Sequence, residues 1–446
     1  MSDTYPIRDI KPAQADEYFA VMDEAFNNNE NPAEAVQREL VTFEFDRSAA
    51  AFDGEQIVGT SGAYTFALSV PGGTAATSGI SNVAVLPAYR RRGIMSAMIG
   101  GLLDDAAVRG EALAALFASE SGIYQRFGFG CAAQSVRCTI QRGEGALIGL
   151  TTPGLPGPVR IRVTAPGSVV GEMAAVYAAA VAARPGGPAR DDRWWRNRID
   201  DPAAQRGGSS PLRCVIAEDA GGPRGYALYS TVPNWGTDGL AANELNVREL
   251  IAADPVAAAA LWADLLSRDL VSQVRTGSRP VDDALLLLLA DRRRARAVVS
   301  DNLWIRLVNV AAALEQRSYA SAVDVVIDVA DGVRPANAGR WRLTASGVGG
   351  AGRVAGAGFA GGAGSAGGAG FAGGADGAGG AVRCERTDDD ADVAVTAAAL
   401  GAAYLGGTRL GALAAAGQVT ELRPGALAEL SAAMAWDPAP WCPMTF

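Results

Sequence analysis

The order of apolar and polar positions in the first 143 residues predicts a mixed α/β or α+β unit. Residues 13–26 place Tyr18 and Met22 on one face of a helix, because these positions recur at helical spacing. Apolar runs typical of strands follow, and Asp53-Gly54 between two of them suits a hairpin turn. The later elements are strands over 50–52, 56–67 and 79–86, a helix over 94–109 and a strand over 113–118.

A similar order of elements returns between residues 144 and 298. A Pro- and Gly-rich stretch, 151–158, is typical of a connection between domains. A helical pattern over 171–183 precedes strand patterns over 213–218, 225–230 and 244–252, and a long helical pattern over 256–270 follows them. We therefore interpret this segment as a structural repeat of the first that lacks an Arg- and Gly-rich loop after its central strand.

The remaining segment, residues 299–446, mixes strand and helix patterns around an insertion of unusual composition. Residues 346–382 are nearly all Gly and Ala, which offers too little apolar surface to offset the entropy of ordering them. We expect a flexible insertion between two strands; the alternative is an aromatic tail whose Phe359 and Phe371 engage a partner. The flanking patterns are strands over 302–310, 322–329 and 339–345, and helices over 393–400 and 425–435.

Histidine is absent from all 446 residues, and this excludes several kinds of catalytic site. No Ser-His-Asp triad, Cys-His pair or His-ligated metal centre can form, so acid–base chemistry must come from other groups, and we expect no metal. The net charge of −9 argues against a partner nucleic acid and is compatible with a cationic substrate. Trp194 and Trp195 lie between two arginines and could form a platform on which bases stack. Because of the same negative charge, we favour interdomain packing as their role.

The cysteines and the apolar runs indicate the cellular compartment in which the protein is expected. The five cysteines form no CxxC pair, which argues against a disulfide framework or a zinc knuckle. The N-terminal residues lack a basic region followed by an apolar one, and the most apolar short run, 284–290, cannot span a bilayer. We therefore expect a cytoplasmic protein with no membrane span.

The stretch from Ile80 to Ser96 carries the clearest chemical signal. An apolar strand pattern ends before Pro87, and the three arginines 90–92 and Gly93 lead into an apolar helix. The first turn of a helix has backbone N–H groups without internal partners, at the positive end of the helix dipole. Gly93 would let a phosphate approach that backbone closely. The pattern predicts a pyrophosphate-binding loop; the alternative is a basic turn that caps a core helix.

Arg90-Arg91-Arg92-Gly93-Ile94 resembles the Q/R-x-x-G-x-G/A loop of GNAT acetyltransferases, which holds the pyrophosphate of acetyl-CoA. Two further stretches, 119–129 and 303–310, and the C-terminal Phe resemble the Eis (enhanced intracellular survival) family of acetyltransferases. The resemblance covers nearly the whole chain and breaks at the Gly/Ala-rich insertion. It implies an α+β (α/β mixed) fold of two tandem GNAT-like domains followed by a sterol-carrier-protein-like α/β domain.

The resemblance identifies each of the three segments as a domain. Residues 1–143 become an N-terminal GNAT domain with the acetyl-CoA site, and residues 144–298 a second GNAT-like domain that lacks the pyrophosphate loop. Residues 299–446 become a sterol-carrier-like domain with the insertion 346–382 and a catalytic C-terminus.

The resemblance also assigns roles to individual residues. Tyr124 matches the family's general acid, and the α-carboxylate of Phe446 matches its general base. The positions that match acetyl-CoA contacts are Val83, Ala84 and Val85 on a strand edge, the loop residues Arg91, Arg92, Gly93, Ile94, Met95 and Ser96, and Ser119 with Glu120.

Acyl transfer from a thioester to an amine is compatible with these two groups. It needs an acceptor for the ammonium proton and a donor for a thiolate whose pKa is about 8.5. Tyr124, with a reference pKa of about 10, is a credible donor. An α-carboxylate is ionised at neutral pH, and it can anchor the ammonium or relay its proton through water. Without the resemblance, Tyr124 reads as a core aromatic and Phe446 as a buried chain end.

We therefore expect an acetyl-CoA-dependent N-acetyltransferase. The family acetylates primary amines, which implies aminoglycoside-like or polyamine substrates and lysine side chains, and it forms a homohexamer. If the substrate range is shared, we expect a wide acidic pocket between the first two domains. The alternative function is a non-enzymatic lipid or sterol binder that uses the C-terminal domain, while a peptide N-terminal acetyltransferase would share the cofactor.

Overall fold

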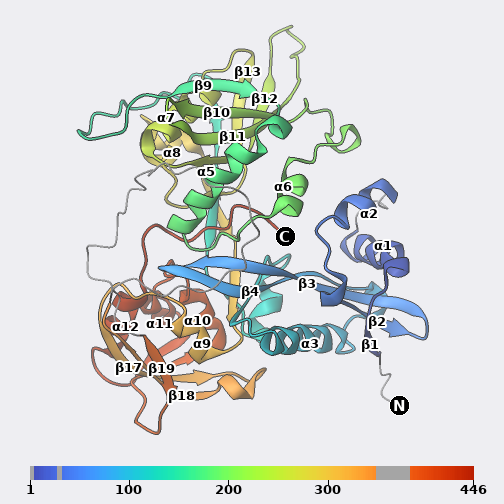
Figure 1. The fold of residues 1–446 in the computed structure, drawn as a ribbon, viewed down its shortest axis with the longest axis vertical. Helices are drawn as coiled ribbons and strands as arrows, with labels where there is room; N and C mark the ends of the chain where they lie inside the picture. The colour runs from blue at the N-terminus through green and yellow to red at the C-terminus, as the bar shows by residue number, and fades with distance from the viewer. Residues whose placement is uncertain (1–4, 28–32, 348–381) are drawn as a thin grey trace.

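Three bodies of mixed helix and sheet surround the C-terminal segment in the computed structural model, which describes residues 5–27, 33–347 and 382–446 (Figure 1). The first body is blue, the second is green and yellow, and the third is orange and red. The C-terminus lies where the first body faces the second. Nearly all of the predicted Gly/Ala-rich insertion lies outside the described residues. Within them, no helix is long and apolar enough to cross a bilayer.

A seven-stranded sheet in the order β1-β2-β3-β4-β5-β16-β6 organises the first body. The strands are Ile7–Asp9 (β1), Ser48–Asp53 (β2), Gln56–Val70 (β3), Gly73–Val85 (β4), Leu113–Leu116 (β5), Trp304–Leu307 (β16) and Gly130–Cys131 (β6). All neighbours are antiparallel except β4 and β5. The predicted hairpin at Asp53-Gly54 is confirmed, because it joins β2 to β3.

Helices cover both faces of this sheet. They are α1 (Ala15–Phe26), α2 (Ala33–Glu39), α3 (Ile94–Val108) and α4 (Ser121–Tyr124). A Cβ added at Gly59 of β3 would meet Met98 of α3, whereas one added at Gly62 would approach Tyr18 of α1. Successive residues of a strand point to opposite faces, so α3 and α1 pack on opposite sides of β3 (Figure 1).

Strand β16 joins the first body to the third. It lies between β5 and β6 although some 190 residues of chain separate it from β5. Trp304 packs in the core cluster under α3, while the next residue, Ile305, packs with Val325 of the third body. The two cores are therefore built on the two faces of one strand.

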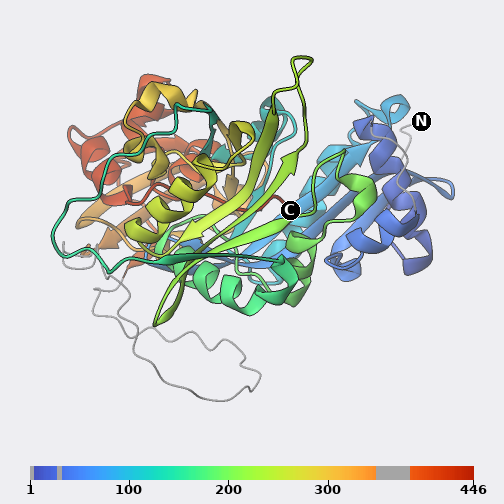
Figure 2. The same ribbon diagram turned by 90° about the horizontal axis from the view of Figure 1, so that it is seen from above.

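The second body is a six-stranded sheet in the order β8-β13-β12-β11-β10-β9 with four helices. The strands are Thr139–Gln141 (β8), Arg160–Thr164 (β9), Arg213–Asp219 (β10), Gly222–Val232 (β11), Asn243–Ala252 (β12) and Val271–Thr276 (β13). The helices are Val170–Ala183 (α5), Asp192–Ile199 (α6), Pro255–Leu266 (α7) and Leu285–Leu288 (α8). Figure 2 shows the long β11–β12 hairpin that projects from this body.

The predicted structural repeat is confirmed by the parallel pair β12 and β13, which are joined through α7 as β4 and β5 are joined through α3. The predicted helix over 256–270 is too long, since it ends at Leu266 and the β-branched stretch after it forms β13. Asp254 caps α7 by accepting hydrogen bonds from the N–H groups of Val256 and Ala257, at 2.9 and 3.0 Å. The helix end that could bind an anion is therefore satisfied by the chain's own carboxylate.

The third body is a five-stranded sheet in the order β19-β18-β17-β20-β21, covered by four helices. Its strands are Val323–Ala330 (β17), Gly339–Ala345 (β18), Arg383–Arg386 (β19), Val393–Thr396 (β20) and Val419–Glu421 (β21). Its helices are Val310–Glu315 (α9), Ala397–Ala403 (α10), Leu410–Ala415 (α11) and Ala426–Met434 (α12). A small sheet of Gln134–Arg137 (β7), Arg279–Pro280 (β14) and Val298–Asp301 (β15) completes the structure.

One helix predicted for the third segment, over 393–400, is wrong in its first half. Val393–Thr396 forms β20, which pairs in parallel with β17. The alternation of valine with smaller residues there favours a strand. Thr396 then caps α10, because its hydroxyl accepts a hydrogen bond from the N–H of Ala399 at 3.1 Å.

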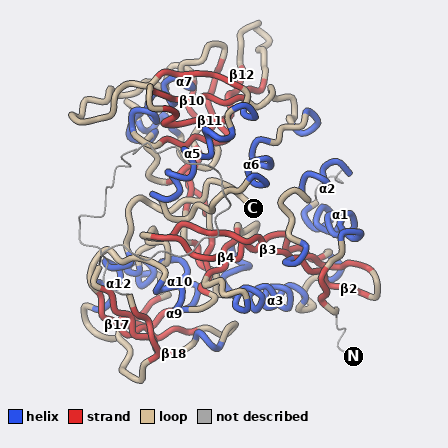
Figure 3. The backbone as a smooth tube through the Cα atoms, in the orientation of Figure 1, coloured by secondary structure: helices blue, strands red, loops and turns tan. Residues whose placement is uncertain are grey.

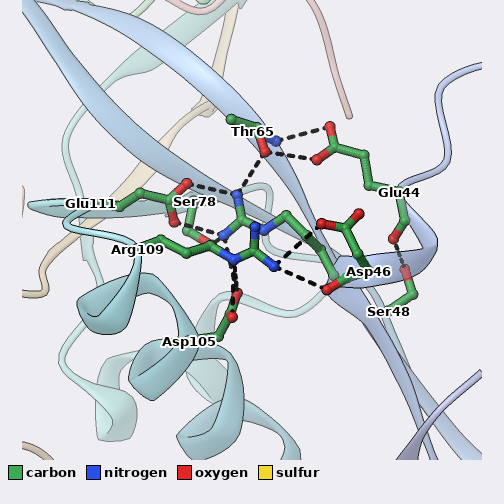
Figure 4. A network of polar contacts seen from close by, with 9 residues as sticks. Glu44, Asp46, Ser48, Thr65, Ser78, Asp105, Arg109 and Glu111 are labelled. Carbon is green, nitrogen blue, oxygen red and sulfur yellow. Dashed lines mark hydrogen bonds and ion pairs between the residues drawn. The ribbon is translucent and has the colours of Figure 1, made fainter.

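A buried ion pair connects the segment before β2 with Glu111, just after α3, within the polar network of Figure 4. Arg47 donates from both terminal nitrogens to the two carboxylate oxygens of Glu111, each at 2.6 Å. It also donates to the hydroxyls of Thr65 and Ser78, at 2.9 and 3.1 Å. The Arg47 side chain is fully buried and that of Glu111 is 5% exposed, so each charge depends on the other.

We expect Glu111→Leu to lower the free energy of unfolding by about 3 kcal/mol, because it removes the bidentate partner of the buried Arg47 guanidinium and leaves it only the partly exposed Asp105, 3.5 Å away. The double variant Arg47→Met with Glu111→Leu should recover much of this loss, and chemical denaturation measures both. As a control, Asp264→Ala removes a partly exposed pair with Arg268 outside this network and should cost about 1 kcal/mol or less. Equal losses in the single and double variants would contradict the prediction.

Candidate functional site

Strands β4 and β5 run parallel but stay paired over only three residues. Thr77, Ser78 and Gly79 pair with residues 113–115, after which β4 continues to Val85. Among the described residues, no strand pairs with the rest of this β4 edge. Its free backbone N–H and C=O groups can therefore pair with an extended ligand. This is the stretch that contains Val83, Ala84 and Val85.

A bulge in β4 was not predicted from the sequence. The register between β3 and β4 shifts between Thr60 and Gly62, and Asn82 adopts a left-handed conformation with a φ of 57°. Asn is one of the few residues besides Gly that adopt this conformation readily, so the polar Asn82 within an apolar strand pattern was the available signal. The bulge leaves one residue out of the ladder where β4 and β5 part.

Helix α3 begins at Ile94, directly after its N-cap residue Gly93, beside this open edge. Gly93 has a φ of 83°, and a Cβ added to it would meet no atom within 4 Å. Ile94 is buried and anchors the first turn, whereas Ser96 is exposed. No side chain caps the first N–H groups of this 15-residue helix, and an uncapped helix start is the geometry of an anion site.

The three arginines of the loop have different surroundings. Arg90 donates to the carbonyl oxygen of Ala25 at 3.1 Å and ties the loop to α1. Arg92 bonds the hydroxyl of Tyr5 and lies over its ring, which holds the guanidinium in place. Arg91 is exposed, and its φ of 64° lies in the left-handed region, so the backbone departs from a regular turn at this residue. Arg90 and Arg92 are therefore both held by groups of the chain itself, Arg92 also by the carbonyl oxygen of Ala88 at 3.2 Å.

Tyr124 ends the short helix α4 beyond β5. Its ring meets Phe129 edge-on, with the centroids 6.2 Å apart, and Val83 and Met95 pack against the same core cluster. The side chain is 6% exposed, and burial raises the pKa of the hydroxyl above its ordinary value. Tyr124 therefore keeps its proton at neutral pH and can donate it. The structure brings this residue, the open strand edge and the start of α3 into one region.

Ser119 and Glu120 lie before α4 and are both exposed. The carbonyl oxygen of Glu120 accepts a hydrogen bond from the N–H of Ile123 at 3.1 Å, so it begins the α4 turn. The two residues follow the end of β5, on the other side of the gap from β4.

Phe446 reaches the same two strands from the opposite face of the sheet. Its ring centroid is 4.8 Å from that of Phe66 on β3 and 5.2 Å from that of Phe117 after β5. A Cβ added at Gly79 would lie 3.2 Å from the Phe446 ring. Gly79 is the last β4 residue paired with β5, so Phe446 lies where the strands part. Tyr124 packs under α3, and the two residues therefore approach this point from opposite faces.

Trp194 and Trp195 confirm the predicted interdomain packing cluster. Trp194 of α6 meets Tyr64 of the first body edge-on at 5.0 Å, whereas Trp195 packs against Tyr177 of the second body at 5.6 Å. Burial raises the pKa of Tyr64 to about 12, so this phenol stays neutral. The wall beside Phe446 is therefore aromatic and comes from both bodies.

Carboxylates gather where α1 and α2 meet the second body. Arg38 of α2 pairs with Asp200 at 3.3 Å. Burial raises the pKa of Glu39, and the charges of Asp23 and Asp200 raise it further, although Arg38 opposes them. Burial is the main cause of the raised pKa, while Asp23 and Asp200 place two further carboxylates near Glu39, against the single guanidinium of Arg38.

Three comparisons with known proteins agree with this arrangement. The acetyltransferase (GNAT) domain family matches residues 6–132 and again residues 186–307. The sterol carrier protein domain family matches residues 310–443.

Similar proteins come from several genera of bacteria. An "uncharacterized N-acetyltransferase" of Streptomyces coelicolor is 39% identical over 98% of this chain and 99% of its own length. The N-acetyltransferase Eis of Mycobacterium tuberculosis is 32% identical over 86% of this chain and 84% of its own. The crystal structure of Eis1 from Mycobacterium abscessus superimposes with a TM-score of 0.77 at 30% identity, over 99% of this chain and 100% of that one. A GCN5-related N-acetyltransferase from Anabaena variabilis shares the fold at 16% identity, with a TM-score of 0.79 over 99% of this chain and 100% of its own.

Proposed function

The chain belongs to the Eis family of GNAT N-acetyltransferases, and from this premise we propose that it acetylates the primary amines of polycationic small molecules, aminoglycoside-like or polyamine, with lysine side chains as further acceptors. Acetyl-CoA is the acetyl donor that GNAT domains use. The observation that carries the proposal is the open start of α3 at Gly93 beside the unpaired edge of β4. A lipid carrier without catalysis would have no use for this pair of features.

The residues present fit acetyl-CoA. The N–H groups at Ile94, Met95 and Ser96 would hold the pyrophosphate together with Arg91 and Arg92. The backbone of residues 83–85 would pair with the amide groups of the pantetheine arm, as an added strand pairs with a sheet edge. Ser119 and Glu120 would contact the cofactor across the gap.

The chain's own groups then supply the proton transfers. The α-carboxylate of Phe446 anchors the substrate ammonium and accepts its proton, directly or through water. Tyr124 would donate its hydroxyl proton to the sulfur while the C–S bond breaks, and the phenolate left behind would regain a proton from water. Backbone N–H groups near Val83 stabilise the charge that develops on the carbonyl oxygen.

The amine class follows from charge. The excess of carboxylates around Glu39, Asp23 and Asp200 lies where the first two bodies meet, and it would attract a polycation. The aromatic wall of Phe66 and Trp194 beside Phe446 would pack on the apolar faces of such a molecule.

A free-thiol assay across aminoglycosides, diamines and lysine peptides tests the proposal, together with calorimetric titration of acetyl-CoA. We expect acetyl-CoA to bind and thiol release to depend on the amine, with polycations giving the highest kcat/KM. Binding of acetyl-CoA without release for any amine would contradict the proposed reaction. By the same resemblance we propose a cytoplasmic homohexamer, which light scattering of the purified protein tests.

Gly93→Ala should weaken acetyl-CoA binding about tenfold, which corresponds to about 1.4 kcal/mol. The added methyl group forces a strained left-handed backbone and projects into the open space that the pyrophosphate would occupy. Gly110→Ala is the matched control, because Gly110 has a φ of 74° and equally open surroundings at the other end of α3. Calorimetry should give an unchanged Kd for the control; equal Kd values for both variants would contradict the assignment.

A further inference from the structure

The C-terminal segment leaves the third body and crosses to the first along the surface of the second (Figures 1 and 3). After α12 ends at Met434, the chain is fixed to the second body at several points. Arg184 donates to the carbonyl oxygen of Ala439, and the N–H of Trp441 donates to the carbonyl oxygen of Pro185 at 2.9 Å. These contacts bring the tail to Cys442 but leave four residues before the terminal carboxylate.

Asn302 holds the backbone of Cys442 from both sides. Its Oδ1 accepts a hydrogen bond from the N–H of Cys442 at 2.7 Å, and its Nδ2 donates to the carbonyl oxygen of the same residue at 3.2 Å. Cys442 is 1% exposed and Asn302 is 5% exposed, so water cannot replace either bond. A carboxamide combines a donor and an acceptor at this spacing, and the pair resembles one step of a β ladder.

Asn302 is itself held by the first body. It connects β15 with β16, and its N–H donates to the carbonyl oxygen of Ala133 at 2.9 Å. Because β16 belongs to the seven-stranded sheet, Asn302 fixes the position of Cys442 relative to the same sheet on which Phe446 packs. This link does not pass through the third body, from which the tail emerges.

The last four residues add two weaker attachments. Met444 is 5% exposed, and its sulfur accepts a hydrogen bond from Nε of Arg190 at 3.4 Å. The ring of Phe446 packs on Phe66 and Phe117. Four extended residues reach at most about 14 Å, so a tail released at Cys442 could move its carboxylate across the whole site.

Arg190 is unsuited to a specific role in placing the tail. Both of its terminal nitrogens bond the carboxylate of Glu249, at 3.0 and 2.7 Å, and its guanidinium lies 3.9 Å from the centroid of the Tyr177 ring. Burial would raise the pKa of Glu249, but the charges of Arg190 and then Arg198 lower it to about 2. A change at Arg190 would therefore disturb the core of the second body. Both shorter bonds of the Asn302 side chain go to the tail, and its third is a 3.5 Å bond to the hydroxyl of Ser278.

We propose that Asn302 is a positioning residue that sets the location of the Phe446 α-carboxylate by clamping the backbone of Cys442. The inference rests on the proposed function, because it assumes that this carboxylate takes part in proton transfer. It identifies a residue outside the substrate and cofactor contacts on which turnover depends.

The test compares Asn302→Ala with Asn337→Ala. Asn337 is also buried, at 4% exposure, and its amide bonds the backbone after β16, at Leu307 and Val310, without touching the tail. We expect Asn302→Ala to lower kcat about tenfold to a hundredfold, since a displacement of about 1 Å of a reacting group has such effects. The KM for acetyl-CoA should change less than about twofold. Asn337→Ala should lower the melting temperature and leave kcat unchanged.

A second variant keeps the test decisive if Asn302→Ala fails to fold. Asn302→Asp keeps the volume and the acceptor for the N–H of Cys442 but turns a second oxygen toward the Cys442 carbonyl oxygen, and it should also lower kcat. Adding two glycines after Phe446 separates the proposed role of the carboxylate from the proposed role of Asn302. If the extended chain is inactive and a further Asn302→Ala change lowers kcat little more, the inference stands.

Other outcomes overturn one idea or the other. If the extended chain keeps full activity, the carboxylate role fails, and the inference fails with it. If the extension abolishes activity while both Asn302 variants keep the parental kcat, the inference fails alone. Equal losses of kcat in Asn302→Ala and Asn337→Ala would show a structural effect and would also overturn it.

Discussion

Adding two glycines after Phe446 is expected to lower kcat for amine acetylation by about 10²–10⁴-fold, the usual range for loss of a general base. The extension moves the terminal carboxylate by up to about 7 Å, while the Phe446 ring can keep its place between Phe66 and Phe117. No histidine exists in the chain to replace the lost group. Stopped-flow or steady-state thiol release measures kcat, and calorimetry should give an unchanged Kd for acetyl-CoA.

Phe446→Leu is the matched control for this extension. It removes the aromatic contacts but keeps an α-carboxylate at the same chain position, so its loss of kcat should be much smaller. If Phe446→Leu loses as much activity as the extended chain, the ring rather than the carboxylate matters. Full activity of the extended chain would remove the terminal carboxylate from the mechanism.

Tyr124→Phe is expected to lower kcat about 10²-fold or more, with little change in the affinity for acetyl-CoA. The substitution removes one oxygen and leaves the ring in its contact with Phe129, so the melting temperature should stay close to that of the parent. Since burial raises the pKa of Tyr124, its hydroxyl stays protonated as the pH rises through 10. The parent should therefore lose activity through Tyr124 only above that pH, and the variant should lack this alkaline decline.

The leaving group provides a sharper test of the acid role. A thioester of a more acidic thiol needs less proton donation as its C–S bond breaks. The ratio of parental to Tyr124→Phe kcat should therefore shrink when an aryl thioester replaces acetyl-CoA at saturating concentration. An unchanged ratio would indicate that Tyr124 acts by packing and not by donating its proton.

Local chemistry made much of the first body predictable. Pro87 and Gly93 predicted where β4 ends and α3 begins, because proline fixes φ and lacks a ladder N–H, and glycine adopts a left-handed φ readily. The β2–β3 turn at Asp53-Gly54 followed from the same reasoning. The error over 393–400 arose because four residues of alternating pattern join a helix of small residues without any breaker between them.

Contacts between distant segments were beyond such reasoning. No local pattern shows that β16 inserts between β5 and β6, or that Asn302 clamps Cys442 across 140 residues of sequence. The bulge at Asn82 depends on how β4 pairs with β3, so no periodic pattern in the sequence predicts it. The roles of Tyr124 and Phe446 came from a family resemblance and stay predictions.

The sequence alone determined the alternation of strands and helices, the absence of histidine chemistry and the loop that opens α3, because these depend on residue type and on neighbours a few positions away. The tertiary structure decided which helix N-terminus stays uncapped and where the chain terminus lies. Asp254 caps the first N–H groups of α7, the corresponding helix in the second body, whereas no side chain caps those of α3 at Gly93. Phe446 reaches the first sheet because packing of all three bodies, and not any local preference, carries the tail there.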